Sequence, residues 1–542
     1  MMEPGHSQAA GPACVRNAAQ LIRRDRQRIA TKVLVGNGVA PANKTTRDAL
    51  GKLHARYDTP LVPPEPDARQ VEIDPAECLK QLMSRAGNTQ TGIDTFGWAD
   101  DMLLVLRGRQ DSPIWAALTS LMATIVEGDL PLAVRYLLTC GALTAIKVPQ
   151  EVNQARVDAG DDPKIRPVNG GMNLLKQTLR VVSQTSSAER VKKGLRPFQL
   201  GLGATAGPER MAIGARALYL SGFVLGAEDA KNAFCSLKRQ EILNSTSATW
   251  PEGVEVCNTV YGLPSISFYS YSGPTGNRVI STVEAHEGTR QGCVLGSFLF
   301  DNTVHHRIYA RLKELFPHVI IRALTDDCIP AFRPPSPDGP YSTWDELYQD
   351  VAAFWTAFDK LANPIGIFRE PSKSKLLIPS DAPEPSPDLD TGGLQLRPVR
   401  DGCVIAGCPI GTDSYIQAHA AAQLEVASKR IDDICLLARD EPQMAIRLLG
   451  SCANKALGYY TRVTPPGLLD EMLHRFDERM SAARTLCLRG DTPSAPPPQR
   501  NEAGKGRPPS RIATHPRRAQ PHTAGHHSPS RLPRLHHSHR GR

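Results

Sequence analysis

Three acidic residues lie in surroundings that favour metal-dependent chemistry. Asp229 follows the apolar run 223–227, which is typical of a buried strand. Asp326 and Asp327 stand between two further apolar runs, which predict two strands joined by a tight turn. Acids at a hairpin tip can face an acid at the end of a neighbouring strand. Taken alone, however, an Asp-Asp pair is an ordinary turn dipeptide, so its meaning depends on the segments around it.

Carboxylates on two adjacent strands suit nucleotidyl transfer. That reaction uses two Mg²⁺ ions about 3.5–4 Å apart. One ion lowers the pKa of the attacking hydroxyl and the other holds the leaving pyrophosphate. Acids on two neighbouring strands can bridge both ions, so the pattern indicates this chemistry if other segments support it.

Two other segments carry groups that suit a nucleotide. Residues 287–296 place glycines on both sides of Arg290 and Gln291, which allows the backbone to approach a base pair closely. Lys164 and Arg166 stand on a stiff extended segment and suit a triphosphate. The Lys164 ammonium would act as a point charge, and the Arg166 guanidinium could donate two parallel hydrogen bonds. Each segment alone would be an ordinary loop or surface turn.

The elements that must position these groups form an α/β body followed by a helical module. Short β-like runs alternate with helices through the middle of the chain. Residues 15–33 predict a basic amphipathic helix, either a solvated surface helix or an arm that contacts nucleic acid. Three helices are predicted near the end of the chain, over residues 415–438, 441–460 and 467–487.

Composition excludes several classes of protein. With 542 residues, 41% apolar and 22% charged, the chain can bury a core, so it is neither collagen-like nor wholly disordered. The net charge of +9 resides in residues 489–542, where eleven Lys and Arg face two acids. That Arg-, Pro- and His-rich tail has almost no large apolar residues and is predicted to be disordered.

Cysteine usage and hydropathy indicate the compartment. The twelve cysteines include no C-x2-C pair, which argues against a zinc ribbon or a disulfide framework. The N-terminus lacks the apolar core of a signal peptide, and charges interrupt the most apolar stretch. We therefore expect a reduced intracellular protein with no membrane association.

In their order along the chain, six segments together resemble the motifs of retrotransposon reverse transcriptases, most closely the non-LTR kind. The resemblance covers about residues 135–487. The fingers signature is similar to residues 164–169 and 199–209, motif A to 229–234, motif B to 287–296, motif C to 324–327, motif D to 371–377 and the primer-grip motif E to 404–411.

This resemblance implies an α/β (α+β) fold of the right-hand polymerase type. The fingers and a palm with an antiparallel sheet would occupy residues 135–402. The primer grip and a helical thumb would follow in residues 403–487. Residues 1–134 would be an N-terminal extension with a basic helix and a Pro-rich linker, and residues 488–542 the disordered tail.

The resemblance also assigns roles to single residues. Asp229, Asp326 and the adjoining Asp327 would be catalytic and hold two Mg²⁺ ions, with Mn²⁺ as the alternative. Phe234 would discriminate between sugars. The remaining nucleotide contacts would be Lys164, Arg166, Arg290, Gln291, Gly292 and, at the departing pyrophosphate, Lys373. Gly407 and Gly411 would belong to the primer grip.

The implied activity is RNA-templated DNA synthesis within a retrotransposon. Its partners would be an RNA template, a DNA primer and deoxynucleoside triphosphates, in the nucleus or the cytoplasm, and the oligomeric state stays open. One alternative is an RNA-dependent RNA polymerase, although the bulky ring of Phe234, five residues after Asp229, would crowd a ribose 2′-hydroxyl. The other is a catalytically silent relic that only binds nucleic acid.

Overall fold

In a computed structural model of the chain, most residues between 12 and 488 are described. The described residues are 12–23, 29–30, 33–34, 39–54, 60–65, 70–74, 76–78, 94–99, 102, 112–148, 164–273, 275–370, 373–385, 394, 396–438 and 441–488. All of them belong to one compact unit, Met1–Thr492. The predicted tail lies outside the described residues apart from Leu488, and so do residues 371 and 372 of the motif D segment.

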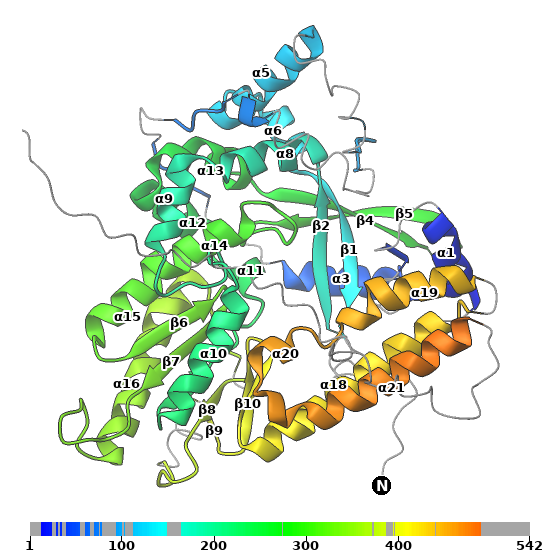
Figure 1. The fold of residues 1–542 in the computed structure, drawn as a ribbon. Coiled ribbons are helices and arrows are strands. Elements are labelled where there is room, and N and C mark those ends of the chain that lie inside the picture. Colours follow the sequence, from blue (N-terminus) through cyan, green and yellow to red (C-terminus); the bar gives the residue numbers. More distant parts are fainter. Residues whose placement is uncertain are drawn as a thin grey trace, which may run out of the picture. The chain divides into compact units, whose positions relative to one another are not determined.

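The described residues form a mixed α/β structure, as predicted, around a five-stranded sheet (Figure 1). Its strands follow the order β6-β7-β3-β8-β9. Their bounds are β3 (Val224–Ala227), β6 (Ile320–Leu324), β7 (Asp327–Phe332), β8 (Lys375–Leu377) and β9 (Arg397–Val399). β3 pairs antiparallel with both β7 and β8, and only β8 and β9 run parallel. The apolar β3 thus lies at the centre of the sheet, which confirms the strand predicted there.

The two faces of this sheet pack against different elements because side chains alternate along each strand. Val224 and Phe332 point into the main core, which includes Trp355 of α16 (Trp344–Ala362). Leu225 and Ala331 point the other way, into a core formed with α10 (Gly207–Leu220) and the hairpin described below. The sheet is therefore covered on both faces, and its functional groups must lie at strand ends.

A second sheet has the strand order β2-β1-β4-β5. Its strands are β1 (Gly141–Lys147), β2 (Ile165–Gly171), β4 (Ser265–Ser272) and β5 (Arg278–Ala285). β1 alternates between buried and exposed residues, as a half-buried strand should. Leu143 and Ala145 on its buried face contact Leu50 of α3 (Lys44–Leu53). Helix α3 is thus part of the hydrophobic core on the buried face of this sheet.

The C-terminal part begins with a hairpin and continues as helices. Its elements are β10 (Gly402–Ile405), β11 (Cys408–Gly411), α18 (Asp413–Cys435), α19 (Pro442–Ser451), α20 (Tyr460–Val463) and α21 (Asp470–Cys487). The first and last predicted helices are confirmed, and α18 and α21 lie side by side (Figure 1). The middle one was predicted too long. It ends at Ser451, just after Gly450, which is a poor helix former.

Of the basic helix predicted over residues 15–33, the structure describes α1 (Pro12–Arg23) and helical residues at 29–30 and 33–34, whereas residues 24–28 and 31–32 lie outside the described residues. Ala18 and Ile22 are buried in the core of the C-terminal helices, together with residues of α18, α19 and α21. Arg23 forms an ion pair with Glu441. This helix therefore packs on the C-terminal helices.

The remaining helices surround the two sheets. They are α5 (Pro113–Glu127), α6 (Leu132–Thr139), α8 (Asn173–Val182), α9 (Ser186–Gly194), α11 (Ala233–Ser236), α12 (Arg239–Thr249), α13 (Val254–Tyr261), α14 (Gly296–Val304) and α15 (Ala310–Leu315), with a π-helical segment at His305–Tyr309. Across the described ranges, no single helix is long and apolar enough to cross a membrane. The pair α5 and α6, bent by 101°, meets that criterion together, by length and composition only.

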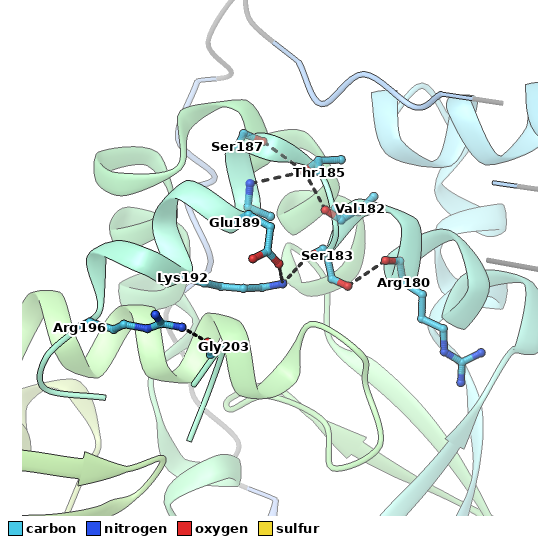
Figure 2. A network of polar contacts seen from close by, with 10 residues as sticks. Arg180, Val182, Ser183, Thr185, Ser187, Glu189, Lys192, Arg196 and Gly203 are labelled. Carbon is cyan, nitrogen blue, oxygen red and sulfur yellow. Dashed lines mark hydrogen bonds and ion pairs between the residues drawn. The ribbon is translucent and has the colours of Figure 1, made fainter. Parts of the chain in front are cut away.

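A polar network joins α8 and α9 (Figure 2). The Thr185 hydroxyl accepts a hydrogen bond from the Ala188 amide (3.4 Å) and so caps α9. Lys192 forms an ion pair with Glu189 (2.8 Å) and also donates to the Ser183 carbonyl. Its ammonium group lies 5.8 Å from the centre of the Phe298 ring. These contacts hold the α8–α9 turn against α14 and fix the start of the loop that leads to Gln199.

Candidate active site

The three predicted acids come together where β3 meets the β6–β7 hairpin. The Glu228 amide donates to the Cys328 carbonyl (3.2 Å), which extends the antiparallel pairing of β3 and β7 by one bridge. Continuing this register places Asp229 opposite Asp327. Asp326 lies in the two-residue turn between Leu324 and Asp327, which pair with each other. The predicted hairpin and the predicted strand end are both confirmed.

Three predicted cations lie close to these acids. The Lys373 ammonium forms an ion pair with Asp229. Burial raises the pKa of Asp326, and the nearby positive charges of Lys373 and Arg166 oppose this rise without cancelling it. Burial and the neighbouring charge of Lys373 lower the pKa of Lys164. The structure thus gathers groups from β2, from the strand end after β3 and from the segment before β8.

Two opposing effects act on the charged form of Lys373 in its ion pair with Asp229. Burial disfavours the charged form of Lys373, but the contact with Asp229 outweighs it, so the pKa of Lys373 is raised. The resemblance implied that Lys373 meets a departing pyrophosphate and did not indicate this pairing.

The acids also raise one another's pKa. Burial and then the charges of Asp326 and Asp229 raise the pKa of Asp327 to about 7. Two buried acids lie behind them, Glu228 (3% exposed) and Asp301 of α14 (0% exposed), and none of their carboxylate oxygens has a hydrogen-bond partner. Burial raises both pKa values well above the usual range. Ionising all five acids of the site at the same time would therefore cost free energy.

We expect this excess of acids to make the protein less stable as the pH rises from about 4 to 7. An exposed Asp has a pKa of about 3.9, whereas folded Asp327 titrates at about 7. In that window the folded state binds more protons than the unfolded state, so the free energy of unfolding falls with pH. Thermal melts across this range will measure the fall. Asp301→Asn should make it shallower, and exposed Asp477→Asn on α21 should not; equal slopes in all three proteins would contradict the expectation.

The carboxylates suit Mg²⁺ in chemistry, because hard oxygen ligands are what this ion prefers in proteins. The mutual repulsion of Asp229, Asp326 and Asp327 is also what a divalent cation would relieve. Among the described residues, however, no group of three His, Cys, Asp or Glu side chains is placed to hold a metal ion. Because Lys373 is paired with Asp229, the three acids provide the negative charge that a magnesium site needs, but their side chains are not arranged around a common position.

Gln199 holds the turn that carries the acids, a role that the sequence did not indicate. Its side chain is fully buried and its amide oxygen accepts from the backbone N–H groups of Thr325 (2.7 Å) and Gly201 (2.9 Å). Its amide nitrogen donates to the Thr325 carbonyl (3.2 Å). Thr325 has φ +59°, which is uncommon for a side chain branched at Cβ. Gln199 thus stabilises a strained turn beside Asp326.

Replacing Gln199 with Leu should lower both stability and activity. Both backbone groups of Thr325 would lose this partner, at a cost of about 1–3 kcal/mol. Gln240→Leu is a matched control, because the Gln240 side chain bonds both backbone groups of Val62 in the same way. Melts should show a clear loss of stability in Gln199→Leu and a smaller one in Gln240→Leu, whose hydrogen bonds are exposed. The rate of primer extension, the activity that the sequence predicts, should drop only in the first. Equal rates in the two variants would show that Gln199 does not position the acids.

Phe234 lies on α11, just after Asp229, and its ring stacks on Phe300 of α14 (centroids 4.7 Å apart, planes at 17°). Its side chain is only partly buried. The Phe234 carbonyl accepts from the Thr289 amide (2.7 Å). A side chain at Gly288, which has φ +73°, would lie 2.3 Å from that carbonyl oxygen. The segment 287–296 can therefore approach Phe234 only because residue 288 is glycine.

The same segment also contacts the second sheet. The Gln291 carbonyl accepts from the Asn169 amide of β2 (2.8 Å). Gly292 has φ +110°, and a Cβ there would lie 2.5 Å from the Asn169 carbonyl oxygen. The predicted segments 164–169 and 287–296 are thus neighbours, and glycine is required at 292 for their close approach.

Arg290 is held by the protein itself. Its guanidinium donates to the Thr139 carbonyl and lies 5.5 Å from the centre of the Tyr261 ring. Its Nε is buried without a partner. A small cavity of about 10 Å³ lies between this segment and β2, lined by Asn169, Glu287, Arg290 and Gln291 among others. Arg290 therefore stabilises the position of its segment.

Gly407 and Gly411 belong to the β10–β11 hairpin. Ala406 (φ +50°) and Gly407 (φ +74°) form its two-residue turn, and the Tyr459 hydroxyl donates to the Ala406 carbonyl (2.6 Å). Gly411 (φ +149°) leaves no room for a side chain, because a Cβ would lie 2.1 Å from the Asp401 carbonyl oxygen. The hairpin contacts α10, α18 and β8.

Comparisons with known proteins show only distant likeness. No protein-family profile and no curated protein matches the sequence. A solved telomerase from Candida albicans, in complex with a TWJ fragment of telomeric RNA, is 11% identical with a TM-score of 0.32, and the match covers 66% of this chain and 62% of that one. An apo telomerase from Candida tropicalis is 12% identical, also with a TM-score of 0.32, over 69% of this chain and 67% of that one. The chain thus spans less than two thirds of the first of these proteins.

Proposed function

We propose that the chain is an RNA-templated DNA polymerase of the reverse-transcriptase kind, within a retrotransposon. The observation that carries the proposal is the meeting of Asp229 with Asp326 and Asp327 across β3 and the β6–β7 hairpin. This is the arrangement expected if the motifs of such enzymes occur in the sequence order described above. The gathering of Lys164, Arg166 and Lys373 at the same place supports it.

In this proposal the five-stranded sheet is the palm of a right-handed polymerase. The second sheet belongs to the fingers, the β10–β11 hairpin is the primer grip and the C-terminal helices are the thumb. Asp229, Asp326 and Asp327 would hold Mg²⁺, which would activate the primer 3′-hydroxyl and stabilise charge on the leaving pyrophosphate. Mn²⁺ is the alternative ion.

The chain's own residues would bind and orient the substrates. Lys164, Arg166 and Lys373 suit the triphosphate, because several cations can share its charge. Arg290 would keep Gln291 and Gly292 in place beside β2, where they would contact the nucleotide or the template. Gly407 and Gly411 would shape the hairpin that holds the primer. Phe234 would exclude a 2′-hydroxyl.

Primer extension by the purified full-length protein tests this function. We expect incorporation of dTMP on poly(rA)/oligo(dT) in the presence of Mg²⁺. Incorporation of ribonucleotides instead would favour an RNA-dependent RNA polymerase. A folded protein that binds RNA and extends no primer would be the catalytically silent relic.

Nuclear or cytoplasmic location follows from the proposed role and is tested by fractionation of the source cells.

A further inference from the structure

An exposed aromatic ring stands beside the candidate acids. Phe368 is 47% exposed, although it belongs to a segment whose backbone pairs with the chain around Asp229. The Lys231 amide donates to the Phe368 carbonyl, and the Glu370 amide donates to the Asp229 carbonyl, each over 2.8 Å. Phe368 is therefore fixed next to the site by two backbone hydrogen bonds that flank its neighbour Arg369.

The alternation of side chains explains why this ring faces outward. Ala230 and Arg369 pair in an antiparallel bridge and point inward, with Ala230 8% exposed and the Arg369 side chain 6% exposed. Residues on either side of such a pair point to the opposite face. Asp229 and Lys231 therefore share the outer face with Phe368.

Arg369 makes the segment rigid. Its guanidinium donates to both carboxylate oxygens of Asp359 (2.7 and 2.5 Å) and to the Leu394 carbonyl (2.8 Å), and it stacks over the Trp355 ring at 5.4 Å. At the start of the segment, Gly366 (φ +86°) lies so close to Ser236 that a Cβ would be 2.2 Å from its carbonyl oxygen. An aromatic ring on such a support would lose little freedom on binding a ligand.

The ligand that fits this surface has an aromatic ring and a compact group of negative charges. Lys231 is exposed next to Phe368, and Lys373 lies at Asp229 with Lys164 close to it. A nucleic-acid strand carries one charge per nucleotide, whereas a triphosphate carries several in one group. The concentration of cations at one place therefore favours a nucleoside triphosphate over a strand.

We propose that Phe368 and Lys231 form a docking platform for the incoming nucleoside triphosphate, with the base stacked on the ring. The proposal rests on the proposed polymerase function, because it takes the triphosphate to be that enzyme's substrate. It adds two residues of this chain to the substrate site. Neither belongs to the nucleotide contacts that the sequence implied.

Calorimetric titration of the full-length protein with dATP and Mg²⁺, without primer or template, tests the platform independently of catalysis. Phe368→Ala should raise the dATP Kd by about 5- to 100-fold, as expected for the loss of one base–aromatic stack. Phe368→Trp should restore most of the affinity, because it keeps an aromatic face. Phe96→Ala is the matched control, since Phe96 is also exposed (40%), and should leave the Kd unchanged.

Inorganic tripolyphosphate separates stacking from charge, because it has no base. Its Kd should be unaffected by Phe368→Ala and raised by Lys231→Ala. The proposal is overturned if wild-type protein binds no dATP, if Phe368→Ala leaves the dATP Kd unchanged, or if it weakens tripolyphosphate equally. A loss of affinity for single-stranded RNA without a loss for dATP would assign the ring to the strand instead. A protein that fails primer extension but shows the expected Kd changes would contradict the polymerase and keep the platform.

Discussion

Asp326→Asn should lower the rate of primer extension by at least ~10³-fold while the protein stays folded. Losing one carboxylate ligand would remove several kcal/mol of stabilisation from the charge that develops in the transition state. The structure adds an expectation about stability. Because the charge of Asp326 helps to raise the pKa of Asp327, its removal should leave the melting temperature at neutral pH equal or higher.

This combination separates a catalytic defect from misfolding. Asp229→Asn should lose activity to the same extent, but it also weakens the ion pair with Lys373 and should not gain stability. Asp477→Asn, exposed on α21, is the control for the loss of one negative charge. The measurements are initial rates on one RNA template and thermal melts of the same preparations. If either active-site variant kept more than a tenth of the wild-type rate, the assignment of the metal ligands would be wrong.

Local sequence patterns predicted the elements that carry the acids. The apolar run before Asp229 gives β3, and the two runs around Asp326 and Asp327 give the β6–β7 hairpin. These predictions succeed because a strand buried on both faces needs a continuous apolar run and a tight turn needs polar residues. That the two elements would be adjacent was implied by the resemblance of the six motifs to those of reverse transcriptases.

Local sequence patterns could not predict contacts between segments that are far apart in the sequence. Gln199 is 126 residues from Thr325, and nothing in its neighbourhood distinguishes an amide that holds a turn from a surface Gln. Ala18 and Ile22 of α1 fit a surface helix as well as a buried one, because an amphipathic pattern does not name the surface it packs on. The pairing of Lys373 with Asp229 likewise depends on the tertiary structure alone.

The sugar preference of the proposed polymerase should depend on Phe234. If the ring lies beneath the incoming sugar, it occupies the volume that a 2′-hydroxyl needs, and the wrong substrate is rejected by a steric clash. Phe234→Ala should then raise ribonucleotide incorporation relative to deoxyribonucleotide by about 10- to 10³-fold, with only a modest loss of extension rate. The partial exposure of Phe234 is compatible with this role, because one side of the ring is free of the Phe300 stack.

The stack on Phe300 makes a structural role for Phe234 a real alternative, and a second variant separates the two. Truncating a core Phe costs about 3–5 kcal/mol, and a partly buried one should fall at the lower end. Phe300→Leu removes the same ring contact from the buried side, so it should lower stability while leaving the Phe234 ring in place. We expect a changed ribonucleotide preference in Phe234→Ala only, measured as the ratio of rates for paired ribo- and deoxyribonucleotides on one RNA template, alongside melts. An unaltered rate ratio in Phe234→Ala, together with a lowered melting temperature, would mean that Phe234 is a packing residue. An equal change of the rate ratio in both variants would mean that the sugar preference depends on the packing of the site and not on the Phe234 ring.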